Sequence, residues 1–213
     1  MALEAIGNMA RHARGDGYAV GYFESWNLES MFGVIDAAEQ TRSPIIIGFN
    51  GEFLSSPGRV MPEPLKVYAQ MGRAMAECAS VPCAFIFNEC SRDQWIERAA
   101  ASGGFNVVMP ADNDATYEDY RRRVAGIVQY AHRRGVAVEA ELGVLPCGVD
   151  GHGHAAASHT DPQQAAAFTK DTGVDLLAVS IGNVHVLTDG RRALDIDHLR
   201  AIREHVDTPL VLH

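Results

Sequence analysis

The chain has 213 residues, of which 47% are hydrophobic and 21% are charged, with a formal net charge of -9. This length and composition suit one globular domain with its own hydrophobic core. The negative charge argues against nucleic acid or an anionic membrane as the main partner. The four cysteines show no CxxC spacing, no run could span a membrane, and the N-terminus lacks a signal-peptide core. We therefore expect a cytoplasmic protein with reduced thiols.

Apolar runs of strand length alternate with segments of helical periodicity along the whole chain. The predicted strands cover residues 18–23, 44–49, 82–87, 106–109, 136–142, 174–181 and 209–212. The predicted helices cover residues 1–14, 27–38, 64–80, 91–102 with Ser91 as the cap, 116–135, 161–171 and 195–206. Residues 50–61 and 143–159 are rich in Gly, Ser or His and are predicted loops. Seven strand–helix alternations with short connections are typical of a parallel α/β fold.

Two parallel folds compete for this pattern. A doubly wound sheet would usually show a Gly-rich phosphate turn after its first strand, but Phe23-Glu-Ser-Trp-Asn27 stands there. A (β/α)8 barrel fits better, although it typically takes about 250 residues, and this chain stops after its seventh predicted strand. We therefore expect residues 1–213 to form a single α/β TIM barrel domain that lacks its eighth unit. We also expect the native protein to continue past His213.

Polar side chains that could take part in catalysis or metal binding follow the predicted strands. The apolar run 174–181 ends in Gly182-Asn183, and His185 comes two residues later. Barrels of parallel strands carry their chemistry at this C-terminal end, although on spacing alone a turn-capping loop histidine explains His185 equally well. The residues that we expect to meet at one mouth of the barrel are Asn88, Glu89, Glu141, His185 and His213.

Several blocks of the sequence share one family pattern. The most specific is residues 130–143, which read Tyr-Ala-His-Arg-Arg-Gly-Val-Ala-Val-Glu-Ala-Glu-Leu-Gly. The other blocks are residues 17–21, 27–29, 43–44, 160–162, 172–175, 176–185 and 209–213. In this order, the blocks resemble the class II, metal-dependent fructose-bisphosphate aldolases over nearly the whole chain. The resemblance implies the barrel fold, lyase activity in carbohydrate metabolism such as glycolysis, and a homodimer.

The resemblance also implies a metal site. In that family three histidines hold a catalytic zinc, and two of them correspond to His185 and His213. The remaining one belongs to an Asp-His pair, which reads Asn88-Glu89 in this chain. A carboxylate can ligate zinc, so Glu89, His185 and His213 would form a three-ligand site with an open position. Manganese and cobalt suit the same ligands, and an ion pair with Lys or Arg explains Glu89 equally well.

Asn88 departs from the family in a second way. The family aspartate at this place handles the proton of the C4 hydroxyl, whereas asparagine can position a hydroxyl but cannot exchange a proton at neutral pH. Either another residue takes that role or the reaction differs. Glu141 matches a family glutamate near a secondary cation site, with a salt bridge as the alternative. The catalytic candidates are Asn88 and Glu141, and the substrate-binding candidates are Asn27, Asn50, Gly182 and Asn183.

Three functions stay open from the sequence. The leading hypothesis is a divergent class II aldolase-like lyase that cleaves a ketose (bis)phosphate to dihydroxyacetone phosphate and an aldehyde, with a divalent metal, zinc first. The alternatives are a metal-dependent lyase or isomerase acting on another phosphorylated sugar, and a non-catalytic sugar-phosphate binding protein. His152, His154 and His159 lie in a Gly- and Ala-rich loop, which favours a solvated lid over a metal site.

Overall fold

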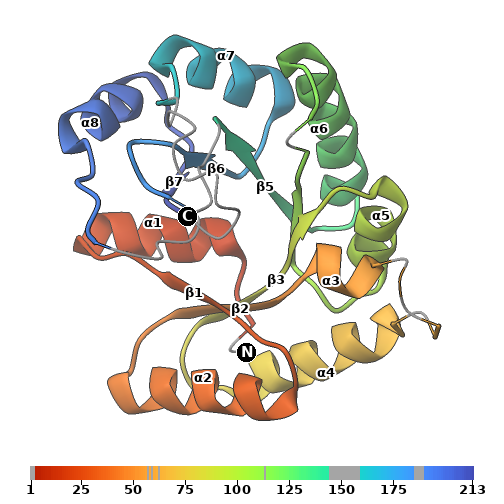
Figure 1. The fold of residues 1–213 in the computed structure, drawn as a ribbon. Helices are drawn as coiled ribbons and strands as arrows, with labels where there is room; N and C mark the ends of the chain where they lie inside the picture. The colour runs from red at the N-terminus through yellow and green to blue at the C-terminus, as the bar shows by residue number, and fades with distance from the viewer. Residues whose placement is uncertain are drawn as a thin grey trace. The chain divides into compact units, whose positions relative to one another are not determined.

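The computed structural model describes residues 3–56, 58, 60–61, 63–112, 114–143, 159–184 and 190–213. Seven parallel strands are hydrogen-bonded to one another in chain order (Figure 1). This is the strand order of a TIM barrel, and the predicted α/β fold is confirmed. The chain divides into two compact units, residues 1–112 with 126–138 and residues 113–125 with 139–213. No helix among the described residues is long and apolar enough to cross a membrane.

The first unit alternates strands and helices. Its strands are β1 (Gly21–Glu24), β2 (Ile45–Asn50), β3 (Cys83–Cys90) and β4 (Val107–Pro110), and its helices are α1 (Ile6–Asp16), α2 (Leu28–Thr41), α3 (Gly51–Ser55), α4 (Leu65–Cys78) and α5 (Asp93–Ala101). β3 is almost wholly buried between β2 and β4. Its continuous apolar run reflects a parallel strand that is covered on both faces.

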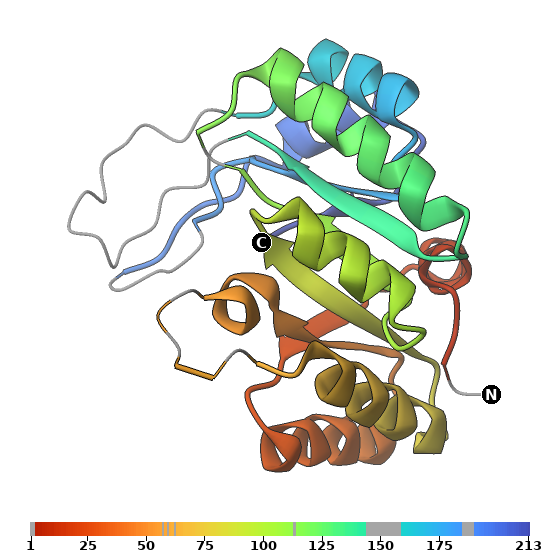
Figure 2. The ribbon, with the colours of Figure 1, turned by 90° about the vertical axis from the view of Figure 1, so that its right-hand side faces the viewer.

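Helices α2, α4 and α5 lie in a row along one face of these strands (Figure 2). The contact between α4 and β3 is close, because a Cβ at Gly72 would lie 2.0 Å from the Phe85 ring. Phe85 also stacks on Phe105 with ring centroids 4.3 Å apart. Aromatic packing at native density therefore fixes the distance between this helix and the strand.

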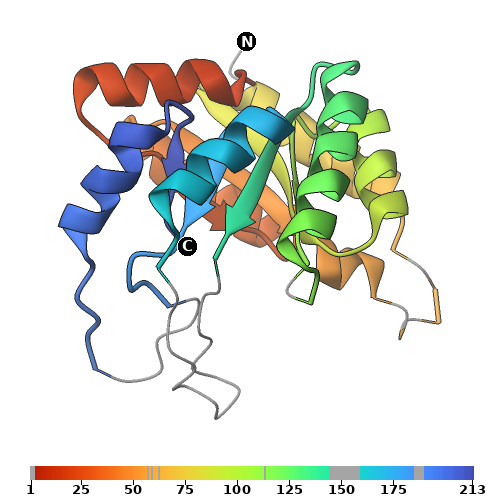
Figure 3. The same cartoon turned by 90° about the horizontal axis from the view of Figure 1, so that it is seen from above.

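The second unit holds the C-terminal strands. Its elements are β6 (Leu176–Val179), β7 (Leu210–Val211), α7 (Pro162–Thr172) and α8 (Ile196–His205), and both α6 (Tyr117–His132) and β5 (Ala137–Leu142) are shared with the first unit. β6 pairs with β5 on one side and β7 on the other, and α7 lies beside α8 (Figure 3). As the sequence predicts, Asp161 caps α7, with Pro162 in its first turn.

Three local predictions were wrong. The short helix α3 occupies part of the predicted loop 50–61, and the Asn50 side chain caps it by accepting a hydrogen bond from the Phe53 N–H. Helix α5 begins at Asp93, so Arg92 rather than Ser91 is its N-cap, and no side chain caps it. Strand β3 continues to Cys90 rather than ending at residue 87. Most of the predicted loop 143–159 lies outside the described residues.

Candidate active site

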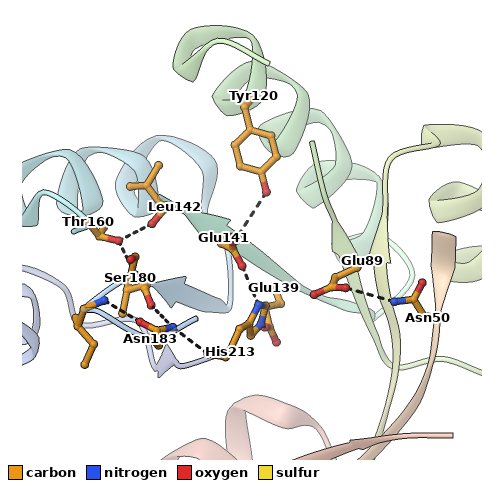
Figure 4. A network of polar contacts seen from close by, with 12 residues as sticks. Asn50, Glu89, Tyr120, Glu139, Glu141, Leu142, Thr160, Ser180, Asn183 and His213 are labelled. Carbon is orange, nitrogen blue, oxygen red and sulfur yellow. Dashed lines mark hydrogen bonds and ion pairs between the residues drawn. The ribbon is translucent and has the colours of Figure 1, made fainter. Parts of the chain in front are cut away.

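A histidine and two glutamates meet in the second unit. Glu139 and Glu141 are two residues apart on β5, so their side chains leave the strand on the same face. His213 follows β7, and its ring lies between them (Figure 4). Its Nε2 is 3.1 Å from Glu139 Oε1, and its Nδ1 is 2.8 Å from Glu141 Oε2. This His213 cluster therefore joins an imidazole to two carboxylates.

The His213 cluster is largely shielded from solvent. The side chains of His213 and Glu139 are 13% and 7% exposed. Burial opposes the charged ring, but the hydrogen bonds to Glu139 and Glu141 and their negative charges outweigh it and raise the pKa of His213 to about 10. Without a bound cation, the raised pKa favours an imidazolium, which is hydrogen-bonded to Glu139 and within ion-pair distance of Glu141.

Two predicted substrate-binding residues support this cluster. The Asn183 amide group donates to the backbone oxygens of His213 at 3.0 Å and Val179 at 3.3 Å. Its oxygen accepts a hydrogen bond from the Ile181 N–H at 2.8 Å. Gly182 has φ 98°, a conformation that L side chains rarely adopt. Asn183 thus fixes the turn after β6 and the backbone of His213 together.

A second network ties the ends of β5 and β6, and the sequence reading missed it. The Thr160 hydroxyl donates to the Leu142 carbonyl and accepts a hydrogen bond from the Ser180 N–H at 2.8 Å. The Tyr120 hydroxyl accepts a hydrogen bond from the Glu141 N–H at 3.4 Å. Figure 4 shows both contacts. The only sequence signal for them was the family block 160–162, which gave no role to Thr160.

The predicted residues of the first unit gather at a bulge in β3. The pairing with β4 shifts register between Phe87 and Cys90, and Glu89 has φ 46°. A left-handed conformation at a non-glycine residue costs on the order of 1–3 kcal/mol and often marks a functional site. The Asn50 amide group donates to Glu89 Oε2 at 3.3 Å (Figure 4). Asn88 is buried beside Glu89 and lies opposite Asn50 in the strand register.

Among the described residues, the side chain of Asn27 hydrogen-bonds to Ser30 and not to the residues of this bulge. Its side-chain oxygen accepts a hydrogen bond from the Ser30 N–H at 2.8 Å, and the Ser30 hydroxyl accepts one from the Asn27 N–H. This reciprocal capping box starts α2. The structure therefore explains Asn27 as a helix cap.

The residue types of the His213 cluster, an imidazole and two carboxylates, are ones that bind divalent cations. Metal-bound histidines usually donate their other ring N–H to a carboxylate, which Glu139 and Glu141 both provide. Binding would require His213 to lose a proton. Within the described residues, no group of three or more His, Cys, Asp or Glu side chains is arranged to hold a metal ion. The predicted ligand His185 lies outside those residues.

Comparison with known proteins gives one consistent result. Residues 4–213 match the family model described as fructose-bisphosphate aldolase class-II. A protein named YdjI from Escherichia coli K12 is 36% identical over 197 residues, covering 92% of this chain and 68% of its own length. The fructose-bisphosphate aldolase of Thermus caldophilus is 35% identical over 211 residues, covering 95% and 65%. The crystal structure of the Escherichia coli YdjI aldolase has a TM-score of 0.84 at 32% identity, covering 100% of this chain and 73% of that one.

Proposed function

Because the chain belongs to the class-II fructose-bisphosphate aldolase family, we propose that it is a lyase that cleaves a ketose phosphate to dihydroxyacetone phosphate and an aldehyde. The observation that carries this proposal is the buried His213 cluster. Glu141 is near the C-terminal end of β5 and His213 follows β7, and barrel enzymes hold their catalytic groups at these ends of the strands. A homodimer and a cytoplasmic location stay predictions.

The proposal includes a divalent cation, with zinc as the first choice. His213 and His185 would hold it, with Glu89 as the third ligand. When bound, the cation supplies positive charge that stabilises the enediolate formed when the carbon–carbon bond breaks. With the cation on one ring nitrogen, one of the two carboxylates, Glu139 or Glu141, would accept the remaining N–H and orient the His213 ring. Asn183 holds the backbone of His213 by its hydrogen bond to the carbonyl.

Cleavage moves one proton away from the C4 hydroxyl. As that proton leaves, the C3–C4 bond breaks, its electrons pass toward the C2 carbonyl, and C3 is later protonated. Asn88 lies buried next to Glu89, and its amide can orient the hydroxyl by a hydrogen bond. An amide does not accept a proton at neutral pH, so in this proposal the proton passes to a different acceptor.

Metal analysis combined with an assay for dihydroxyacetone phosphate tests the proposal. We expect the purified protein to bind zinc, to lose cleavage on chelation, and to recover it when zinc is returned. His213→Ala should remove both metal and activity. The matched control is His205→Ala, because His205 is exposed on α8 and contacts only its own helix backbone in the described hydrogen bonds.

Two results would contradict the proposal. Full cleavage by His213→Ala, or by protein treated with chelator, would exclude the role given to His213 and the cation. Tight binding of ketose phosphates without any cleavage would favour the alternative of a sugar-phosphate binding protein.

A further inference from the structure

A small pocket opens in the first unit, at the C-terminal ends of β1 and β2. Its volume is about 70 Å³. A water needs roughly 10–15 Å³ of such volume, so the pocket has room for roughly five non-hydrogen atoms. This is the size of a two-carbon fragment with its hydroxyl groups. The lining residues include Ser25, Trp26, Asn50, Phe53 and Glu63.

Ser25 gives this pocket an unsatisfied polar group. The residue is only 2% exposed, and its hydroxyl has no hydrogen-bond partner among the described residues. Its backbone N–H donates to the Gly48 carbonyl at 2.8 Å, so the missing hydrogen bond concerns only the side-chain hydroxyl. Buried hydroxyls without partners are rare because they cost stability. The lining of the pocket therefore includes a buried hydroxyl whose hydrogen bonds the described residues do not satisfy.

Two aromatic rings form the outer wall of the pocket. Trp26 and Phe53 meet edge to face, with ring centroids 4.7 Å apart. They stay 59% and 56% exposed, although large aromatic side chains are mostly buried. An exposed indole gives an apolar surface against which the C–H groups of a sugar chain can pack.

The charge of the lining opposes an anion. Glu63 contributes a carboxylate, and none of the eight described residues that line the pocket is Lys or Arg. Phosphate sites in proteins are built from Arg, Lys or clustered backbone N–H groups. A like charge next to a phosphate would weaken its binding.

We infer that this pocket binds the far end of the aldehyde half of the substrate, and that this end is an uncharged, hydroxylated group rather than a phosphate. The inference rests on the proposed lyase function and narrows its substrate class. Asn50 connects the pocket to the proposed cation site, since it lines the pocket and also donates to Glu89, the proposed cation ligand. Ser25 donates to or accepts from a substrate hydroxyl, and Trp26 packs against the carbon chain.

The reverse reaction tests this preference with matched acceptors. Dihydroxyacetone phosphate is offered with glyceraldehyde, with glyceraldehyde 3-phosphate, or with lactaldehyde, which lacks the terminal hydroxyl. Both enantiomers of each are used, so that stereochemistry does not decide the result. We expect kcat/KM for glyceraldehyde to exceed that for each of the other two by about tenfold. Equal or better use of the phosphorylated aldehyde would overturn the inference.

Two variants connect the preference to the pocket. Glu63→Lys should shift the ratio of kcat/KM toward the phosphorylated aldehyde by about tenfold, and the control Glu97→Lys, on the exposed side of α5, should leave it unchanged. Ser25→Ala should raise KM for glyceraldehyde, but not for lactaldehyde or dihydroxyacetone phosphate. Ser43→Ala is its exposed control. Equal shifts in variant and control would refute the role of the pocket.

A binding measurement separates this inference from the lyase proposal. Trp26 and Trp95 are the two tryptophans of the chain, so Trp95→Phe leaves Trp26 as the fluorescence reporter. We expect glycerol to change its emission at concentrations where glycerol 3-phosphate does not. That result in a protein without lyase activity would refute the proposed reaction and still support the pocket inference. A stronger response to glycerol 3-phosphate would overturn the inference even in an active lyase.

Discussion

Replacing Glu139 by glutamine removes one negative charge from the His213 cluster while keeping a hydrogen-bond acceptor. Glu139 is buried, and its Oε1 lies 3.1 Å from His213 Nε2. Glutamine has nearly the same shape, so the variant changes the electrostatic interaction more than the packing. Its effect on the metal-free protein should therefore depend on the charge of His213, and hence on pH.

The sign follows from the raised pKa of His213, which is about 10 in the folded protein against an ordinary value of 6.5. The stabilisation of the folded state by the charged His213 ring is fully present below pH 6.5 and is lost as the pH rises to about 10. Each pKa unit corresponds to 1.36 kcal/mol, so the charged ring stabilises the folded state by roughly 5 kcal/mol, as the net of its desolvation and its attraction to the two carboxylates. Because Glu141 remains in the variant, we expect a loss of about 2–3 kcal/mol near pH 6 and little loss above pH 10.

Urea denaturation with a chelator present, at several pH values between 6 and 10, measures this loss. The difference between parent and variant removes the contribution of other titrating groups. Glu77→Gln is the control, because its pair with Arg73 at 2.8 Å is partly exposed and should contribute about 0.5 kcal/mol or less. A difference that stays constant across this pH range, or that matches the control, would refute the charged state of His213.

Two further predictions concern packing and proton transfer. Gly72→Ala should destabilise the protein by about 1–3 kcal/mol in thermal denaturation, because its Cβ would overlap Phe85. Gly126→Ala, with nothing within 4 Å of the new Cβ, should stabilise α6 by about 0.5–1 kcal/mol. A Gly72→Ala variant more stable than the Gly126→Ala variant would contradict the described packing. Asn88→Asp combined with Glu89→His should raise cleavage of a ketose 1-phosphate by at least about a hundredfold. A parent that already matches the double variant would show that Asn88 is no handicap.

The fold could be predicted because its signals are local. Each strand appears as a short apolar run, and helix ends carry their own markers, such as Asp161 at the start of α7 and Gly173 with φ 73° at its end. Helix α3 was missed because the Gly and Ser residues of 50–61 suggest a loop. The Asn50 cap and the burial of Leu54 favour the helix instead, and burial is a tertiary effect that propensity does not contain.

The site could be predicted only in part, because its contacts are distant in sequence. The alternation along β5 places Glu139 and Glu141 on one face, but it does not indicate that both contact a histidine 74 residues from Glu139. That pairing depends on β7 following β6 in the sheet. The left-handed backbone of Glu89 was equally hidden, since it arises from the bulge between β3 and β4. Hydrogen bonds that cross between strands are not encoded in local spacing.

Relative to the family pattern, the residues at positions 88 and 89 keep the same net charge but place it one residue further along the strand. The family pattern to which the chain is similar has an aspartate followed by a histidine, which together carry one negative charge when the histidine is neutral. Asn88 and Glu89 also carry one negative charge, but it is displaced by one residue along the strand. The charge at the proposed ligand position changes from neutral to negative, so Glu89 would attract the cation more strongly than an imidazole and leave it a weaker Lewis acid. The proton acceptor at residue 88, however, is lost completely. The exchange therefore favours a site that keeps its cation but relies on a different group for the proton, and the hydrogen bond from Asn50 helps to orient the displaced carboxylate.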